Sequence, residues 1–113
     1  MDRALALAEE AAAHDEAPVG AVVVEGERVL AAERNRMREL NDPTAHAEIV
    51  VIRRAAQALK RLTLDAAHGT HLRLFTTCEP CAMCLGATLW SGVQRVVSGA
   101  QARWCRCDRR PGS

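Results

Sequence analysis

The chain has 113 residues, of which 49% are hydrophobic and 3% aromatic, and its formal net charge is +1. This length fits one compact domain, and the absence of any run near the ~18 apolar residues of a membrane helix argues against a spanning protein. A charge near zero gives no general reason to expect nucleic-acid binding. There is no basic start followed by an apolar run, and the five cysteines are an odd number. We therefore expect a soluble, cytoplasmic protein with reduced thiols and no membrane partner.

The first third of the chain predicts a helix followed by a β-hairpin. Residues 2–14 are rich in Ala, with apolar positions at helical spacing. Residues 19–24 and 28–33 are short runs suited to strands, and only residues 25–27 separate them. The two strands should be antiparallel neighbours.

A polar stretch at residues 35–43 ends in a turn signal, Asn-Asp-Pro. Thr44 follows it and is a suitable cap for a helix over residues 45–59. This second helix brings the first group of candidate catalytic residues.

The rest of the pattern alternates strands and helices. Residues 72–76 predict a strand, Pro80 stands where a helix begins, residues 81–90 continue that helix, and residues 94–98 predict a further strand. The order α-β-β-α-β-α-β indicates a three-layer α/β protein, although the sequence does not determine the order of the strands in the sheet.

Two short motifs carry the chemistry. His46 and Glu48 form a His-x-Glu pair, and Cys81 and Cys84 form a Pro-Cys-x-x-Cys segment 35 residues further on. His and Cys are the usual zinc ligands, and three protein ligands leave a fourth position open, as in catalytic zinc sites. Both motifs fall at predicted helix starts, so the two helix ends should face one ion.

Glu48 is placed to move protons beside such an ion. Replacing an exocyclic amine by oxygen requires proton transfer from water, to a ring nitrogen and to the departing ammonia, and one buried carboxylate can serve all these steps. Taken separately, Cys-x-x-Cys could be a redox pair and His-Ala-Glu a core histidine beside a surface carboxylate. Their combination favours a zinc-dependent deaminase.

These motifs resemble those of the zinc-dependent cytidine and deoxycytidylate deaminase superfamily, in the branch of guanine deaminase and tRNA adenosine deaminase. Residues 18–22 are similar to the first strand of the tRNA-editing enzymes, and residues 42–48 are similar to both groups. Residues 78–87 are closer to guanine deaminase. The resemblance implies a three-layer α-β-α cytidine-deaminase-like fold with a central mixed sheet, and a homodimer.

The resemblance assigns Zn²⁺ binding to His46, Cys81 and Cys84 and proton transfer to Glu48. It assigns substrate contacts to three further positions, Asn35, Ala47 and Trp90. An amide such as that of Asn35 can both donate and accept, as reading a purine edge requires. Asn35 could instead be an ordinary turn residue, and Trp90 could pack at a helix end.

Similarity to the family ends near residue 100. We expect a deaminase domain over residues 1–100 and a divergent basic tail over residues 101–113, with the fold shortened at its C-terminus relative to the family. Cys105 and Cys107, in the tail, are expected to be exposed thiols. Such shortening would remove the terminal helix that grips RNA in the tRNA-editing enzymes.

Three functions follow from these expectations. The first is a deaminase of a purine base or nucleoside, favoured by residues 78–87. The second is a deaminase of tRNA or single-stranded nucleic acid, favoured by residues 18–22 and by the basic character of the second half of the chain. The third is a shortened homologue that binds zinc without activity.

Overall fold

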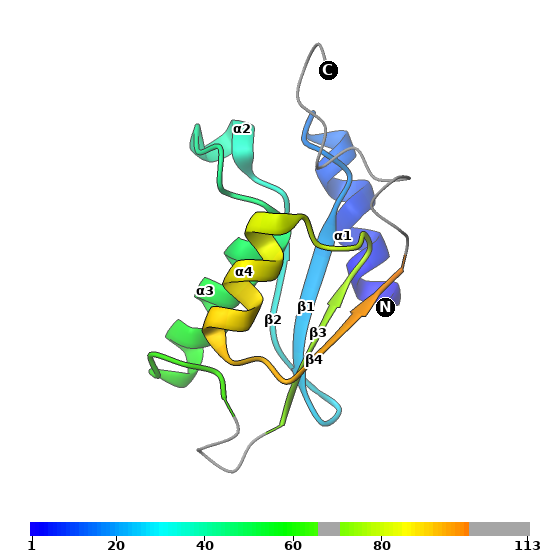
Figure 1. Cartoon of the computed structure of the whole chain (residues 1–113). Coiled ribbons are helices and arrows are strands. Elements are labelled where there is room, and N and C mark those ends of the chain that lie inside the picture. Colours follow the sequence, from blue (N-terminus) through cyan, green and yellow to red (C-terminus); the bar gives the residue numbers. More distant parts are fainter. Residues whose placement is uncertain (66–70, 100–113) are drawn as a thin grey trace.

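The computed structural model describes residues 1–65 and 71–99 (Figure 1). Its elements, in chain order, are α1 (Asp2–Ala13), β1 (Gly20–Glu25), β2 (Arg28–Arg34), α2 (Met37–Leu40), α3 (Ala47–Leu59), β3 (Leu72–Thr76), α4 (Ala82–Ser91) and β4 (Arg95–Ser98). All elements expected from the sequence are present, with the short helix α2 in addition. The proposed tail, residues 101–113, lies outside the described residues. Among the described residues, no helix has the length and apolar character needed to cross a membrane.

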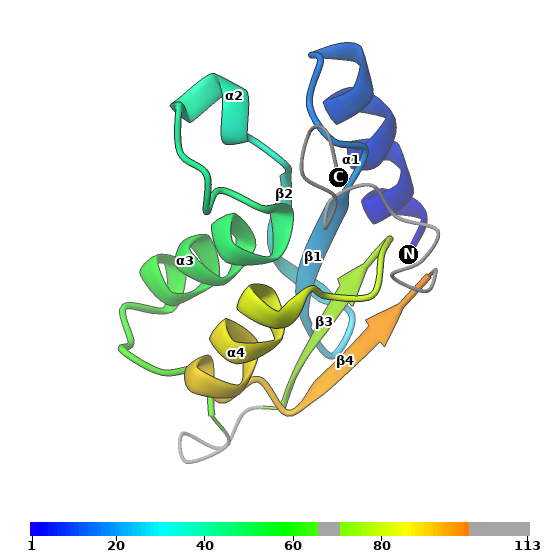
Figure 2. The same ribbon diagram turned by 45° about the horizontal axis from the view of Figure 1, so that its top comes forward.

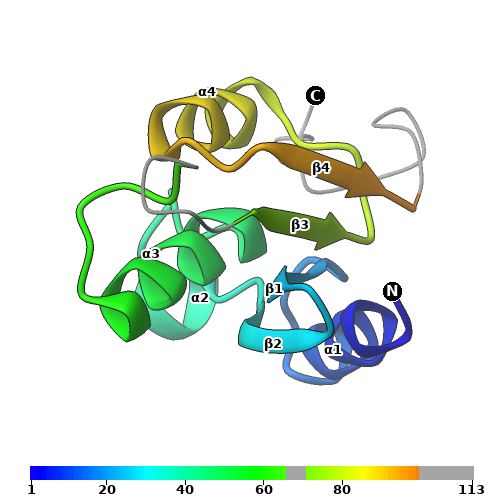
Figure 3. The same ribbon diagram turned by 90° about the horizontal axis from the view of Figure 1, so that it is seen from below.

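The strands form one mixed sheet in the order β2-β1-β3-β4. β1 pairs antiparallel with both β2 and β3, whereas β3 and β4 are parallel. The parallel pair requires a crossover, and α4 provides it. Helix α1 covers one face of the sheet, and α3 and α4 cover the other (Figures 2 and 3). The expected three-layer fold with a mixed sheet is thus confirmed.

Alternation along β1 divides the core between the two faces. Ala21 and Val23 belong to the core cluster that includes Val51 of α3. Val22 and Val24 belong to the cluster that includes Ala4 of α1. Successive side chains of a strand point to opposite faces, so an unbroken apolar strand fills both layers. β1 is therefore the centre of the domain.

Gly20 allows α1 to approach the start of β1 closely. A Cβ at this position would collide with the carbonyl oxygen of Ala4 and lie 2.8 Å from Cβ of Leu7. Its amide donates to Oγ1 of Thr77 at 3.1 Å, and its carbonyl accepts from the amide of Thr77 at 3.0 Å. The first strand is thereby joined to the segment that leads into the cysteine motif.

Thr44 does not cap α3, contrary to the sequence expectation. The N-cap residue is His46, and Thr44 instead donates through its hydroxyl and its amide to Oδ1 of Asp42, at 2.7 and 2.8 Å. These two hydrogen bonds are the main reason that the pKa of Asp42 lies below its usual value. The Asp-Pro-Thr turn uses the hydroxyl locally, and the helix begins two residues later than the cap would have placed it.

Candidate metal centre and substrate site

Two helix N-termini bring the predicted metal ligands together. His46 is the N-cap residue of α3, Cys81 is the N-cap residue of α4, and Cys84 lies in the first turn of α4. Cys81 and Cys84 are three residues apart, so they share one face of the helix. His46 and Cys84 are buried, and Cys81 is partly exposed. This is the arrangement that the two motifs predict.

The distances between the donor atoms fit a zinc ion. Nδ1 of His46 lies 3.6 Å from Sγ of Cys81 and 3.3 Å from Sγ of Cys84, and all three donor atoms lie within 4.8 Å of one another. A tetrahedron with bonds of about 2.1 Å to nitrogen and about 2.3 Å to sulfur has edges of roughly 3.5 Å. Cys81 and Cys84 are not disulfide-bonded, so both can bind as thiolates. The group therefore fits zinc and leaves one position of a tetrahedron open.

Glu48 belongs to the first turn of α3, two residues after His46, and its side chain is only 1% exposed. Burying a carboxylate costs free energy, so a buried glutamate indicates a role other than solubility. Its place on the same helix end as a metal ligand is what proton transfer at the metal would require. Proton transfer by Glu48 stays a prediction.

Asn35 is buried at the end of β2, with 1% of its surface exposed. Its Nδ2 donates to Oε1 of Glu16 at 3.3 Å, and its Oδ1 is buried without a hydrogen-bond partner among the described residues. The next residue, Arg36, donates its amide to the carbonyl of Ala45 at 3.0 Å, beside the metal ligand His46. Asn35 is thus close in structure to the start of α3, and reading of a base by its amide stays a prediction.

Burial of the Ala47 side chain limits the substrate contact predicted for this residue. This residue is fully buried, and its side chain belongs to the core cluster under the sheet. A substrate contact at Ala47 would therefore come from its backbone, and it too stays a prediction.

The segment between β2 and α3 is held by charges that the sequence analysis did not single out. Buried Arg34 donates to Oε1 of Glu39 at 2.6 Å, and Arg36 bonds Glu33 and Glu39, each at 2.8 Å. The hydrogen bond from Arg34 is the main reason that the pKa of Glu39 is lowered, and the bond to Glu33 raises the pKa of Arg36. The charged forms are thus stabilised together. Glu33 lies in β2 and Arg36 precedes α2, so no helical spacing in the sequence indicates this network.

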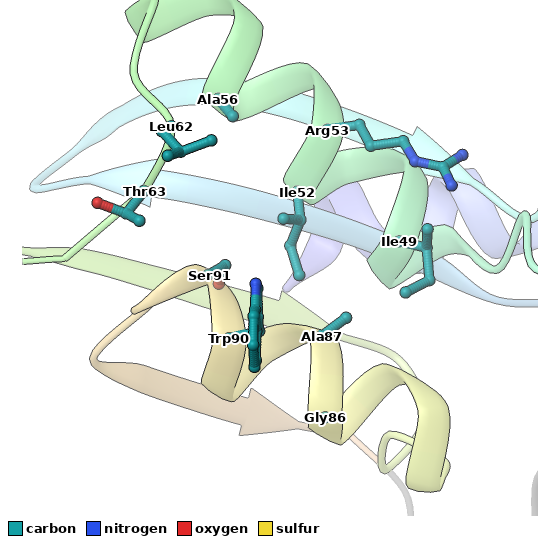
Figure 4. Close-up of a pocket in the computed structure, with 10 residues that line it drawn as sticks. All are labelled: Ile49, Ile52, Arg53, Ala56, Leu62, Thr63, Gly86, Ala87, Trp90 and Ser91. Carbon is teal, nitrogen blue, oxygen red and sulfur yellow. The ribbon is translucent and has the colours of Figure 1, made fainter.

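Trp90 lies away from the metal ligands, near the C-terminal end of α4, about 13 Å along the helix from Cys81 at 1.5 Å per residue. Its side chain is 90% exposed, so packing of Trp90 in the core is excluded. It lines a groove of about 750 Å³ between α3 and α4, opposite Ile52 and Ile49 (Figure 4). Stacking of a substrate base on Trp90 stays a prediction that this position does not favour.

Of the three cysteines outside the metal centre, only Cys78 lies within the described residues. Cys78, after β3, is buried. Cys105 and Cys107 lie outside the described residues. Cys81 and Cys84 are free cysteines, so the donor set is intact.

A three-layer α/β domain with a His-Cys-Cys centre between two helix ends defines a class of metal-binding proteins with an open coordination position. The model of the cytidine and deoxycytidylate deaminase zinc-binding region matches residues 1–100, and the chain belongs to this family. Zinc is therefore the metal that the centre is placed to hold. The family suggested by the two motifs is confirmed.

Two relatives represent the two branches expected from the sequence. The chain is 48% identical over 101 residues to the tRNA-specific adenosine deaminase of Agrobacterium fabrum, covering 89% of this chain and 63% of that protein. It is 42% identical over 84 residues to the guanine deaminase of Bacillus subtilis, covering 74% of this chain and 51% of that protein. The chain thus spans about half to two thirds of the length of these relatives.

A solved structure from work on A-to-I editing by tRNA:A34 deaminases superposes with a TM-score of 0.85 at 45% sequence identity. The superposition covers 93% of this chain and 77% of that chain. The fold of the described residues is therefore that of the family.

Proposed function

We propose that the chain is a zinc-dependent hydrolytic deaminase that acts on a purine base or nucleoside and releases ammonia. The observation that carries this proposal is a three-ligand centre with a buried carboxylate on the same helix end, His46 with Glu48. A fourth protein ligand would close the site, and a buried carboxylate beside an open metal position can transfer protons.

The chemistry divides between the metal and the protein. Zinc held by the three ligands would activate a water for attack at the amine-bearing carbon of the ring. Glu48 accepts one proton from that water and delivers it to the ring nitrogen, and it then moves the remaining proton from the new hydroxyl group on the ring carbon to the departing amine, so that amine and water become carbonyl and ammonia. The amide of Asn35 holds the base edge.

The free base or nucleoside is favoured by residues 78–87, which are similar to guanine deaminase. A second candidate is adenosine in tRNA or another single-stranded nucleic acid. Residues 18–22 favour it, and the match to the Agrobacterium fabrum enzyme covers more of the chain at higher identity than the match to guanine deaminase.

A side-by-side ammonia assay with guanine, adenosine and a tRNA stem-loop separates the candidates. We expect release from guanine or adenosine in preference to the stem-loop. Phosphate contacts make nucleic-acid binding salt-dependent, so activity on RNA should fall steeply between about 50 and 200 mM salt while activity on a neutral base should not. Salt-sensitive turnover of the stem-loop alone would establish the second candidate. Inactivity of zinc-loaded protein on all three would instead favour a zinc-binding homologue without activity.

We also propose that a second copy of the chain covers the exposed apolar face of α4. The exposed apolar residues on this helix are Met83, Leu85, Leu89 and Trp90. Of these, Trp90 also lines the groove between α3 and α4, which is itself lined largely by apolar side chains (Figure 4). Contiguous apolar surface of this kind marks an interaction site more often than a solvent face.

Light scattering of Leu89→Asp tests the dimer. Leu89 is 74% exposed, so an aspartate there costs little in a monomer but buries a charge in a dimer. The wild type should have twice the mass of the variant. Leu5→Asp, an exposed leucine of α1 on the other face of the sheet, is the matched control and should stay dimeric. A monomeric wild type would contradict the proposal.

We place this activity in the cytoplasm, because both zinc-binding cysteines must remain thiolates and a reducing compartment keeps them so.

A further inference from the structure

The side chain of Glu16 connects the turn after α1 to the substrate side of the domain. It is 7% exposed, and both of its oxygens accept hydrogen bonds from one distant segment. Oε1 accepts from Nδ2 of Asn35 at 3.3 Å and from the amide of Arg38 at 3.0 Å, and Oε2 accepts from the amide of Glu39 at 2.8 Å. One carboxylate therefore holds the end of β2 and the start of α2 together.

The contact with Glu16 determines which way the amide of Asn35 is turned. A carboxylate can accept but cannot donate, so Nδ2 must face Glu16 and Oδ1 must face away. Oδ1 is buried without a hydrogen-bond partner among the described residues, and leaving such an acceptor unsatisfied is unfavourable. A hydrogen-bond donor on a bound molecule would satisfy it. The second hydrogen on Nδ2 remains available for an acceptor of the same molecule.

None of the hydrogen bonds that Glu16 accepts from the described residues comes from a metal ligand. His46, Cys81 and Cys84 are positioned by the starts of α3 and α4, and none of the hydrogen bonds to Glu16 comes from those helices. The effect of Glu16 therefore reaches the base-reading amide without passing through the zinc centre.

We infer that Glu16 is a positioning residue for substrate recognition, which fixes the amide of Asn35 in the orientation that reads the purine edge. This inference rests on the proposed deaminase function. The orientation of the Asn35 amide then depends on a residue in the turn that precedes β1, and this turn after α1 has a role in specificity.

Glu16→Gln is the test, assayed on the purine that the wild type deaminates. Glu16 accepts hydrogen bonds from three N–H groups, and the amide of glutamine would turn its own NH₂ group toward at least one of them. The hydrogen bonds that hold residues 35–39 are therefore weakened. We expect KM to rise about tenfold or more, because hydrogen bonds to charged groups are stronger than average, with kcat changed less than threefold and one zinc per chain. Asp15→Asn removes a charge from the neighbouring residue, which is exposed, and should leave KM unchanged.

A double-mutant cycle with Asn35→Ala identifies the route of the effect. Asn35→Ala alone should raise KM with zinc retained, and adding Glu16→Gln to it should raise KM little further, since the amide to be positioned is gone. If Glu16→Gln melts below the assay temperature, Glu16→Asp, which keeps the charge but shortens the reach, should show the same change in KM in milder form.

Two results would overturn the inference while leaving the deaminase function in place. One is an unchanged KM in Glu16→Gln, and the other is a rise in KM that adds fully to that of Asn35→Ala. Inactivity of zinc-loaded wild type on every purine would instead overturn the proposed function, and the inference with it.

Discussion

Replacement of Glu48 by glutamine is expected to lower kcat by about 10²- to 10⁴-fold, the usual contribution of general acid/base catalysis. Glutamine has nearly the size of glutamate, so the packing around this fully buried position should be preserved. What it loses is the ability to accept a proton from water and pass it to the base. Zinc content should stay near one per chain, because Glu48 is not among the three ligands.

The measurement is kcat on the purine identified by the ammonia assay, with zinc determined on the same sample. Glu25→Gln, a carboxylate at the hairpin end of β1, serves as the control for loss of one negative charge and should keep wild-type kcat. Near-normal turnover by Glu48→Gln with zinc bound would show that protons are moved by another group.

Replacement of Cys81 by alanine is expected to remove both the zinc and the activity. Two ligands from the described set would remain, and they cannot hold the ion as three do. Metal analysis of protein purified without chelators should give about one zinc per wild-type chain and close to none for the variant. Met83→Ala changes a partly exposed residue of the same helical turn and should keep its zinc.

Chelation adds a second readout of the same site. A bound metal stabilises the folded state, so a chelator should lower the melting temperature of the wild type and of Met83→Ala but not that of Cys81→Ala. Full zinc occupancy in Cys81→Ala would refute the ligand set. A ratio near two in the wild type would indicate another site outside the described residues.

The metal centre could be predicted from the sequence because its ligands are local to two helix starts. His46 follows a turn signal, Pro80 precedes Cys81, and the three-residue spacing to Cys84 places both sulfurs on one face. These relations depend only on neighbouring residues, and the helices that carry them have strong apolar patterns. The structure confirms this placement.

The segment around α2 could not be predicted in the same way. The helix has four residues and no buried side chain, so no apolar periodicity marks it. Its stability depends on Glu16, which is more than 20 residues away, and on Arg34, a charged residue buried against expectation. A long-range contact between polar groups leaves no pattern in the sequence. The order of the strands escaped prediction for a related reason, since both edges of β1 can accept a neighbour.

The position of Trp90 does not favour the base-stacking role that family resemblance assigned to it. An aromatic residue at the end of a helix fits a stacking role or a packing role equally well in the sequence. The structure excludes packing in the core, because 90% of the residue is exposed. Its position beside an open groove instead makes it part of the face for which a second copy is proposed.

A zinc ion bound by His46 and by the two cysteines would cross-link segments of the chain that are 35 residues apart. The unfolded chain does not present the three ligands together, so the ion binds the folded state and stabilises it, and it joins the start of α3 to the start of α4. The fraction of the protein that is folded then depends on the concentration of available zinc. Cells starved of zinc would therefore contain less of the protein, because a larger fraction of it would be unfolded and degraded.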